Sequence, residues 1–113
     1  MINIKIFRQI ALSFSEANEQ PHFEKTSFRI AKKIFATLDI KKDEACIKLS
    51  LTDQGIFSVF DKTIIFPVPN KWGKQGWTII NLNKTRKDML TDALAAAYCN
   101  MAPKKLSILI RKK

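Results

Sequence analysis

The residue types that could perform chemistry are few in this chain of 113 residues. His22 is the single histidine, and the two cysteines, Cys46 and Cys99, stand far from it and from each other. Nucleophilic catalysis needs a nucleophile, a nearby base and a group that orients the base, and no such set can be drawn around His22. A zinc site needs three or four ligands at regular short spacing, and nucleotide cofactors need a Gly-rich phosphate loop. The sequence therefore predicts no catalytic residue, no metal and no cofactor, and it favours a protein that is not an enzyme.

Residues 72–77, with the sequence WGKQGW, form the most distinctive segment. Together with the preceding Lys71 they combine two indole rings, two glycines and the ammonium groups of Lys71 and Lys74. Indole faces stack on bases and ammonium groups attract phosphates, so the combination suits nucleic acid. In the competing structural interpretation, Trp77 opens a strand in the core and the glycines supply turn conformations. Trp72 is then the ring expected to contact a ligand.

The charge of the chain indicates a polyanionic partner. Twenty lysines and arginines against ten acidic residues give a net charge of +10 and a pI near 9.9. Such a surplus on a small protein suits DNA or another polyanion, whereas lysines in turns also keep sheet edges soluble. The predicted nucleic-acid contacts are Lys32, Lys33, Lys71, Trp72, Lys74, Lys104 and Lys105.

The spacing of apolar residues predicts the elements that position these side chains. Apolar positions three and four apart over residues 4–14 predict a helix. Alternation with a period of two predicts a hairpin over residues 27–38 that turns near Lys32, and a third strand over residues 45–49. These three strands would form an antiparallel meander.

The second half of the chain predicts further strands and helices. A short helix capped by Ser50 or Thr52 would end at Phe60, followed by an edge strand over residues 64–66 and a strand over residues 77–82. Residues 86–101 are typical of a helix, with Thr85 as its cap. Residues 104–113 would add a short basic helix or strand that turns Leu106, Leu109 and Ile110 inward.

This order of elements predicts an α+β fold, in which N-terminal and C-terminal helices pack on one face of an antiparallel sheet. The length suits a single domain over residues 1–113. The longest stretch without charge, residues 93–103, is shorter than the roughly 20 apolar residues of a membrane span. Lys5 and Arg8 interrupt any secretory signal at the N-terminus, so we expect a cytoplasmic protein without membrane contact.

Three segments of the sequence resemble the MmcQ/YjbR family: PHFEKTSFRIAKKIFATL at residues 21–38, WGKQGWTIINL at residues 72–82 and APKKL at residues 102–106. The resemblance implies a single-domain bacterial protein with a frataxin-like (CyaY-like) fold, described as a double-wing DNA-binding-like domain. It brings no catalytic set. The matching positions are Ser27, Phe28, Ile34, Phe35 and Ala36 in the hairpin, Trp72, Gly73, Gly76 and Trp77 in the loop, and Pro103, Lys104 and Leu106 near the end.

The chain departs from this family at two turns. Members often have glycine at the hairpin turn, where this chain has residues 31–33 with the sequence AKK. They also often have Pro-Gly after the first helix, where this chain has residues 16–18 with the sequence EAN.

Two classes of function fit these observations. The first hypothesis is a monomeric DNA-binding module. Its basic turns and the segment of residues 72–77 would contact phosphates, largely without reading base sequence. The alternative is a small adaptor that binds an acidic protein or small molecule through a groove beside Trp72. A third hypothesis, iron handling, rests on fold analogy alone. Iron binding needs clustered carboxylates, and this sequence offers only a small group, Glu16, Glu19 and Glu24, with its other acidic residues dispersed among lysines.

Overall fold

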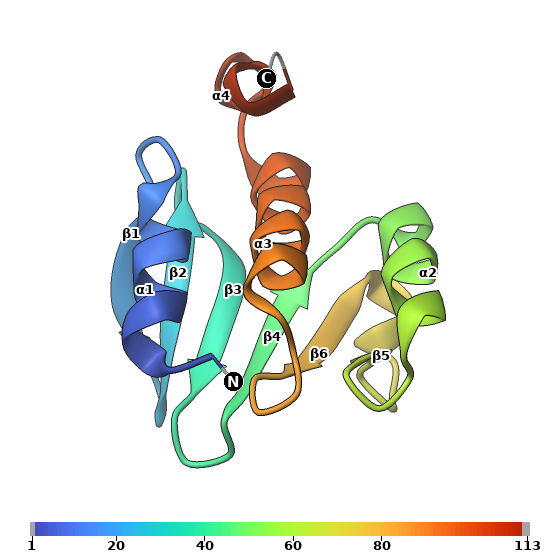
Figure 1. The fold of residues 1–113 in the computed structure, drawn as a ribbon. Coiled ribbons are helices and arrows are strands. Elements are labelled where there is room, and N and C mark those ends of the chain that lie inside the picture. The colour runs from blue at the N-terminus through green and yellow to red at the C-terminus, as the bar shows by residue number, and fades with distance from the viewer. Residues whose placement is uncertain (1, 112–113) are drawn as a thin grey trace.

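The computed structural model describes residues 2–111 and consists of one six-stranded antiparallel sheet with helices on one face (Figure 1). The strand order is β1-β2-β3-β4-β6-β5. The predicted α+β architecture is therefore confirmed. In chain order the elements are α1 (Ile4–Ser13), β1 (Asn18–His22), β2 (Lys25–Ile30), β3 (Lys33–Asp39), β4 (Glu44–Lys48), α2 (Leu51–Phe60), β5 (Ile65–Pro67), the 3₁₀ turn η1 (Gly73–Gln75), β6 (Trp77–Asn81), α3 (Lys87–Met101) and α4 (Lys104–Arg111).

The core lies between the sheet and the helices α1 and α3. Alternation along the strands turns one set of side chains toward these helices, as the register pairs Leu38 with Ala45 and Ala45 with Ile80. Phe7 and Ala11 of α1 and Leu94 of α3 are fully buried from the other side. None of the helices within residues 2–111 lies over the opposite face of the sheet (Figure 1).

A β-bulge in β3 adds an aromatic ring to this core. Phe28 pairs with Ala36 and Arg29 pairs with Ile34, so Phe35 between them has no partner on β2. Both Phe35 and Ala36 are fully buried, which strict alternation would not allow. The Phe35 ring packs edge-on against Tyr98 of α3, with centroids 5.7 Å apart.

Strand β1 was not predicted, and that omission was wrong. Its sequence NEQPH has no apolar alternation, and most of its side chains are exposed. β1 pairs with β2 alone, and a proline such as Pro21 is tolerated in an edge strand because no second neighbour needs its missing N–H. A polar edge strand of this kind gives no signal in hydrophobic periodicity.

The helix starts were predicted in part. Ser50 caps α2 as predicted, because its Oγ accepts a hydrogen bond from the backbone N–H of Asp53 at 3.1 Å. Thr85 is not the cap of α3. Arg86 occupies that position, and the buried Thr85 hydroxyl has no hydrogen-bond partner among the described residues.

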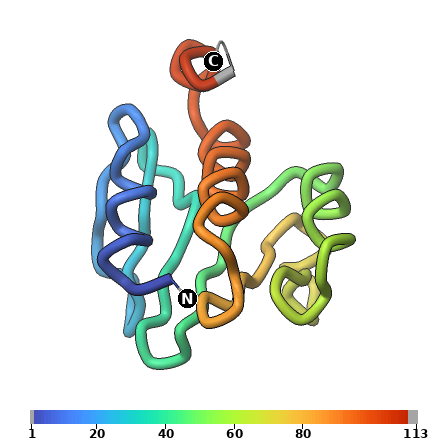
Figure 2. Tube along the Cα trace, viewed as in Figure 1, coloured from blue at the N-terminus to red at the C-terminus, as the bar shows by residue number. Residues whose placement is uncertain are grey.

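Helix α4 packs against the end of α3 and stands away from the middle of the sheet (Figure 2). Leu106 is buried and Ile110 is half-buried, as predicted. Leu109 is 56% exposed, so the prediction that it turns inward was wrong. The predicted segment extended to residue 113, and residues 112 and 113 lie outside the described residues. No helix within residues 2–111 combines the length and apolar character that crossing a membrane requires.

The two turns that depart from the family pattern contain residues in the left-handed region. Ala31 and Lys32 have φ of 51° and 69°, and Glu16 has φ of 61°. Residues with a Cβ adopt this region at a cost of about 1–2 kcal/mol each, whereas glycine does not. The chain thus makes the same turns as glycine would, with added strain.

Candidate nucleic-acid interface

The seven predicted contact residues all lie at the same end of the sheet. The register places the start of β3 beside the end of β4, and the end of β4 beside the start of β6, where Lys48 pairs with Trp77. The Asn100 side-chain amide donates to the carbonyl oxygen of Lys48 at 3.2 Å, which fixes the end of α3 and the start of α4 nearby. We call this part of the molecule the basic end; its members are Lys32, Lys33, Lys71, Trp72, Lys74, Lys104 and Lys105, all of them exposed.

Acidic residues are concentrated at the opposite end of the sheet. That end carries the β1–β2 and β3–β4 turns, the end of α2 and the start of α3 (Figure 1). Of the ten acidic residues, six lie there. Repulsion of a polyanion is therefore weaker at the basic end than at the opposite one. The six residues are Glu24, Asp39, Asp43, Glu44, Asp61 and Asp88.

The lysines of the basic end form no ion pair within the described residues. Among the side chains that the structure describes, two ion pairs form, Arg8 with Glu19 at 2.8 Å and Arg86 with Asp88 at 3.4 Å. Neither pair includes a lysine of the basic end. Its ammonium groups are consequently available to an external anion.

Gln54 of α2 holds the tryptophan loop, residues 68–76, against the sheet. Its side-chain amide nitrogen donates to the carbonyl oxygens of Gly73 and Trp77, at 2.9 and 3.2 Å, and to the Thr78 hydroxyl at 3.1 Å. Gln54 and Thr78 are both buried, so these hydrogen bonds are shielded from water. The loop that presents Trp72 is therefore fixed by α2.

Two glycines allow the tryptophan loop to approach its neighbours closely. A Cβ at Gly73 would lie 2.0 Å from the carbonyl oxygen of Val68, and one at Gly76 would lie 1.9 Å from that of Leu49. Gly76 also has φ of 105°. The interpretation of these glycines as conformational residues therefore holds, because a side chain at either position would push the loop away.

Each tryptophan of the segment has a lysine near its ring. The Lys71 ammonium lies 5.7 Å from the Trp72 ring centroid, and the Lys48 ammonium lies 6.0 Å from that of Trp77. Lys48 also donates to the carbonyl oxygen of Gln75. Trp72 is 50% exposed, so one aromatic surface remains accessible beside a cation.

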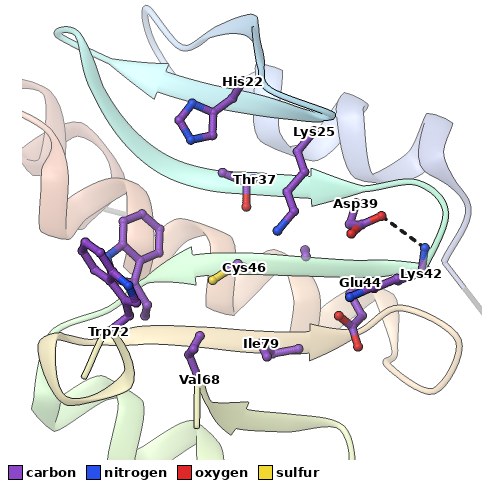
Figure 3. A pocket seen from close by; sticks show the side chains of 12 residues that line it. His22, Lys25, Thr37, Asp39, Lys42, Glu44, Cys46, Val68, Trp72 and Ile79 are labelled. Carbon is purple, nitrogen blue, oxygen red and sulfur yellow. Dashed lines mark hydrogen bonds between the residues drawn. The ribbon is translucent and has the colours of Figure 1, made fainter. Parts of the chain in front are cut away.

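The sheet face without helices carries a groove of about 470 Å³, which we call the sheet groove (Figure 3). Trp72 lies at one end of it and Lys42, Asp39 and Glu44 lie at the other. The remaining lining residues are His22, Lys25, Thr37, Ala45, Cys46, Val68, Trp77 and Ile79.

The sheet groove corrects two interpretations of the sequence. Trp77 was expected in the core, yet it is half-buried and lines the groove, because alternation along β6 sends Thr78 and Ile80 to the helices instead. His22 and Lys25 were not predicted as site residues, since they flank the β1–β2 turn and β1 itself was missed. One feature of the sequence did point to the groove face: the alternation along residues 45–49 places Cys46 on the face of the sheet opposite to that of Ile47.

Cys46 is a neutral part of the groove. Burial raises the pKa of its thiol from 9.0 to about 11, against the opposing effect of the nearby Lys25 ammonium. A thiol in this state is a poor nucleophile and metal ligand at neutral pH. Within residues 2–111, no three His, Cys, Asp or Glu side chains gather as a metal site would require.

Comparison with known proteins shows first a similar fold and then the family. The structure is similar to the crystal structure of Deinococcus radiodurans protein DR2400, described with a DUF419 domain, with a TM-score of 0.74. The match covers 88% of this chain and 78% of that one at 18% sequence identity, so the likeness concerns the fold. A search of curated proteins gave no match. The YjbR family model matches residues 12–100, and the chain belongs to the YjbR family.

Proposed function

We propose that this protein binds nucleic acid, and DNA in particular, through the basic end, mostly by contacts to phosphates. The observation that carries the proposal is the uneven balance of charge along the sheet. Six exposed lysines share one end, and the three segments that carry them, residues 31–34, 68–76 and 102–108, contain no acidic residue. At the other end, six of the ten acidic residues lie among a similar number of lysines and arginines. An excess of positive charge at one end orients a basic protein on a polyanion. In this proposal the chain acts as a cytoplasmic monomer without a cofactor or a catalytic step.

Each part of the basic end has a defined role in the proposal. In the proposal, the turn at Lys32 and Lys33, the first turn of α4 and the tryptophan loop contact different phosphates of one ligand, because all three lie at the same end of the sheet. Phosphate contacts give affinity and orientation without base recognition. Trp72 adds an aromatic surface that stacks on any exposed base.

The salt dependence of binding tests the proposal. Neutralising about six phosphates predicts that the logarithm of the association constant falls with the logarithm of salt concentration at a slope of roughly −5. Fluorescence anisotropy of labelled duplex and single-stranded DNA, titrated at about 50 and 200 mM salt, measures this slope. Absence of binding at the lower concentration, or affinity that does not change with salt, would contradict the proposal.

A protein partner is the second candidate, and the surface of α2 favours it. Leu51, Ile56, Val59 and Phe60 of this helix are between 55% and 80% exposed. Clustered apolar side chains on a surface are typical of protein interaction sites. If this candidate is correct, Val59→Asp abolishes capture of the protein partner because it places a charge in the apolar surface. Trp72→Ala then leaves capture unchanged, and DNA fails to compete for binding.

A further inference from the structure

The sheet groove changes in chemical character along its length (Figure 3). Trp72 closes one end, and Val68, Cys46 and Ile79 form an apolar floor. Lys25 extends over the middle of the floor from the β1–β2 side. An aromatic surface, an apolar floor and a cation thus follow one another, and this is the order in which a nucleotide presents its base, sugar and phosphate.

The cationic part of the groove comes from the two residues that flank the β1–β2 turn. His22 ends β1 and Lys25 begins β2, and the two residues are paired across the turn. Figure 3 shows both side chains above the floor, with Thr37 below them. Lys25 forms no ion pair among the described side chains and is exposed, so its ammonium group can accept an anionic ligand.

The dimensions suit one nucleotide. Trp77 and Ile79 both line the groove and are two residues apart on β6, so the groove extends over at least about 7 Å along the strand. The groove volume of about 470 Å³ lies within the range of roughly 300–1,000 Å³ that small-molecule sites occupy. A stacked duplex cannot place a base on this floor, whereas an unstacked base of a single strand can.

The carboxylates at the far end limit the groove to a single phosphate. Asp39 and Glu44 lie beyond Lys25 as seen from Trp72 (Figure 3). They would repel a second phosphate that continued along the groove, although Lys42 beside them offsets part of this repulsion. The next phosphates of a strand are consequently directed out of the groove.

We propose that the sheet groove binds one unstacked nucleotide, with its base against Trp72 and its phosphate at Lys25 and His22, presented by a single strand of nucleic acid. This inference rests on the proposed function and makes it specific: the basic end contacts the flanking phosphates, and the groove favours single strands over duplexes. A free mononucleotide has the same chemistry but lacks the flanking phosphates, so it binds more weakly.

The test compares groove variants on matched ligands. A labelled oligothymidylate, a blunt duplex of equal length and thymidine monophosphate are titrated against the wild type, Trp72→Ala, Trp72→Phe and Lys25→Ala. Lys41→Ala is the control for Lys25, because it removes the same charge from an exposed lysine at the same end of the sheet. Inorganic phosphate serves as the ligand without a base.

Trp72→Ala is expected to weaken oligothymidylate binding by roughly 5- to 150-fold, the range for loss of one stacked base. Trp72→Phe is expected to keep part of the affinity that Trp72→Ala loses, because it retains an aromatic ring. Lys25→Ala should weaken single-strand binding more than Lys41→Ala does. For every variant, the affinity for duplex should change less than the affinity for the single strand. Equal losses on single strand and duplex, or no difference between the two lysine variants, would overturn the inference.

The two proposals fail in different ways. If duplex and single strand bind equally and Trp72→Ala has no effect, the basic end binds DNA but the groove inference is wrong. If thymidine monophosphate binds as tightly as oligothymidylate, the groove takes free nucleotides, and presentation by a strand is overturned. If neither DNA form binds at low salt, the proposed function itself fails.

Discussion

The side-chain amide nitrogen of Gln54 lies 2.9 Å from the carbonyl oxygen of Gly73, and this contact joins α2 to the tryptophan loop. The two residues are far apart in sequence, and both are buried. The hydrogen bond fixes the loop from beneath, while Trp72 on the outside stays accessible. The position of the candidate site therefore depends on a polar residue of a helix that does not itself belong to the basic end.

Replacing this residue tests that dependence. Gln54→Leu leaves the carbonyl oxygens of Gly73 and Trp77 without their buried donor and is expected to lower the free energy of unfolding by about 1–3 kcal/mol. Urea unfolding measures the loss. Gln75→Leu, at an exposed position of the same loop, is the control and should change stability by less than about 0.5 kcal/mol. Equal stability of the two variants would contradict the account of the loop.

Glycine replacements at two positions should have opposite effects. Gly76→Ala places a Cβ 1.9 Å from the carbonyl oxygen of Leu49 at a φ of 105°, so we expect a loss of at least about 1–3 kcal/mol. Gly55→Ala lies inside α2 with nothing within 4 Å of the new Cβ, and should gain roughly 0.5–1 kcal/mol. Thermal unfolding of both variants gives the comparison, and a stabilised Gly76→Ala would show that the loop geometry is wrong.

Ala31→Gly should stabilise the protein. The φ of 51° at Ala31 costs about 1–2 kcal/mol for a residue with a Cβ, and glycine avoids this strain. Its greater freedom in the unfolded chain offsets roughly 0.5–1 kcal/mol, so the expected net gain is about 0.5–1 kcal/mol. Lys32 and Lys33 remain, and DNA affinity should therefore be unchanged. Chemical unfolding would contradict the assigned turn if the variant were less stable than the wild type.

Alkaline pH should destabilise the fold through Cys46. Burial raises the pKa of its thiol from 9.0 to about 11, so the folded state favours the neutral form. The contribution is fully present below pH 9 and is lost progressively as pH rises through about 11, because the unfolded chain ionises first. Cys46→Ala removes the titrating thiol. Between pH 9 and about 11, the free energy of unfolding of this variant should therefore fall less steeply than that of the wild type. Parallel pH profiles for the two proteins would refute the assignment.

The parts of the fold that follow from periodicity were predictable. Phe7, Ile10 and Ala11 recur at helical spacing, and Phe28 and Ile30 alternate along β2, so α1 and the hairpin could be recognised from sequence. Strand β1 could not, because polar residues at a sheet edge carry no apolar alternation. The bulge at Phe35 was equally hidden, since a single extra residue is set by pairing with β2.

The exposed lysines and Trp72 of the basic end could be selected from the sequence, but the sheet groove could not. The lysines and Trp72 stood out by type, whereas their placement at one end of the sheet depends on the strand order. Whether the face bearing Trp77 is covered depends on where α1 and α3 pack, which is a tertiary property. Lys25 and His22 enter the groove through the β1–β2 turn, and no local pattern marks them.

The most direct test of the central claim is a comparison of two variants with equal loss of charge at opposite ends of the sheet. One carries Lys32→Ala, Lys33→Ala, Lys104→Ala and Lys105→Ala; the other carries Lys5→Ala, Lys41→Ala, Lys84→Ala and Lys87→Ala, and all eight positions are exposed. Their affinities for labelled DNA are measured at several salt concentrations. The account predicts that the first variant loses about four units of salt slope and most of its affinity, while the second stays close to the wild type. Equal losses in the two variants would contradict the claim that one end of the sheet binds nucleic acid.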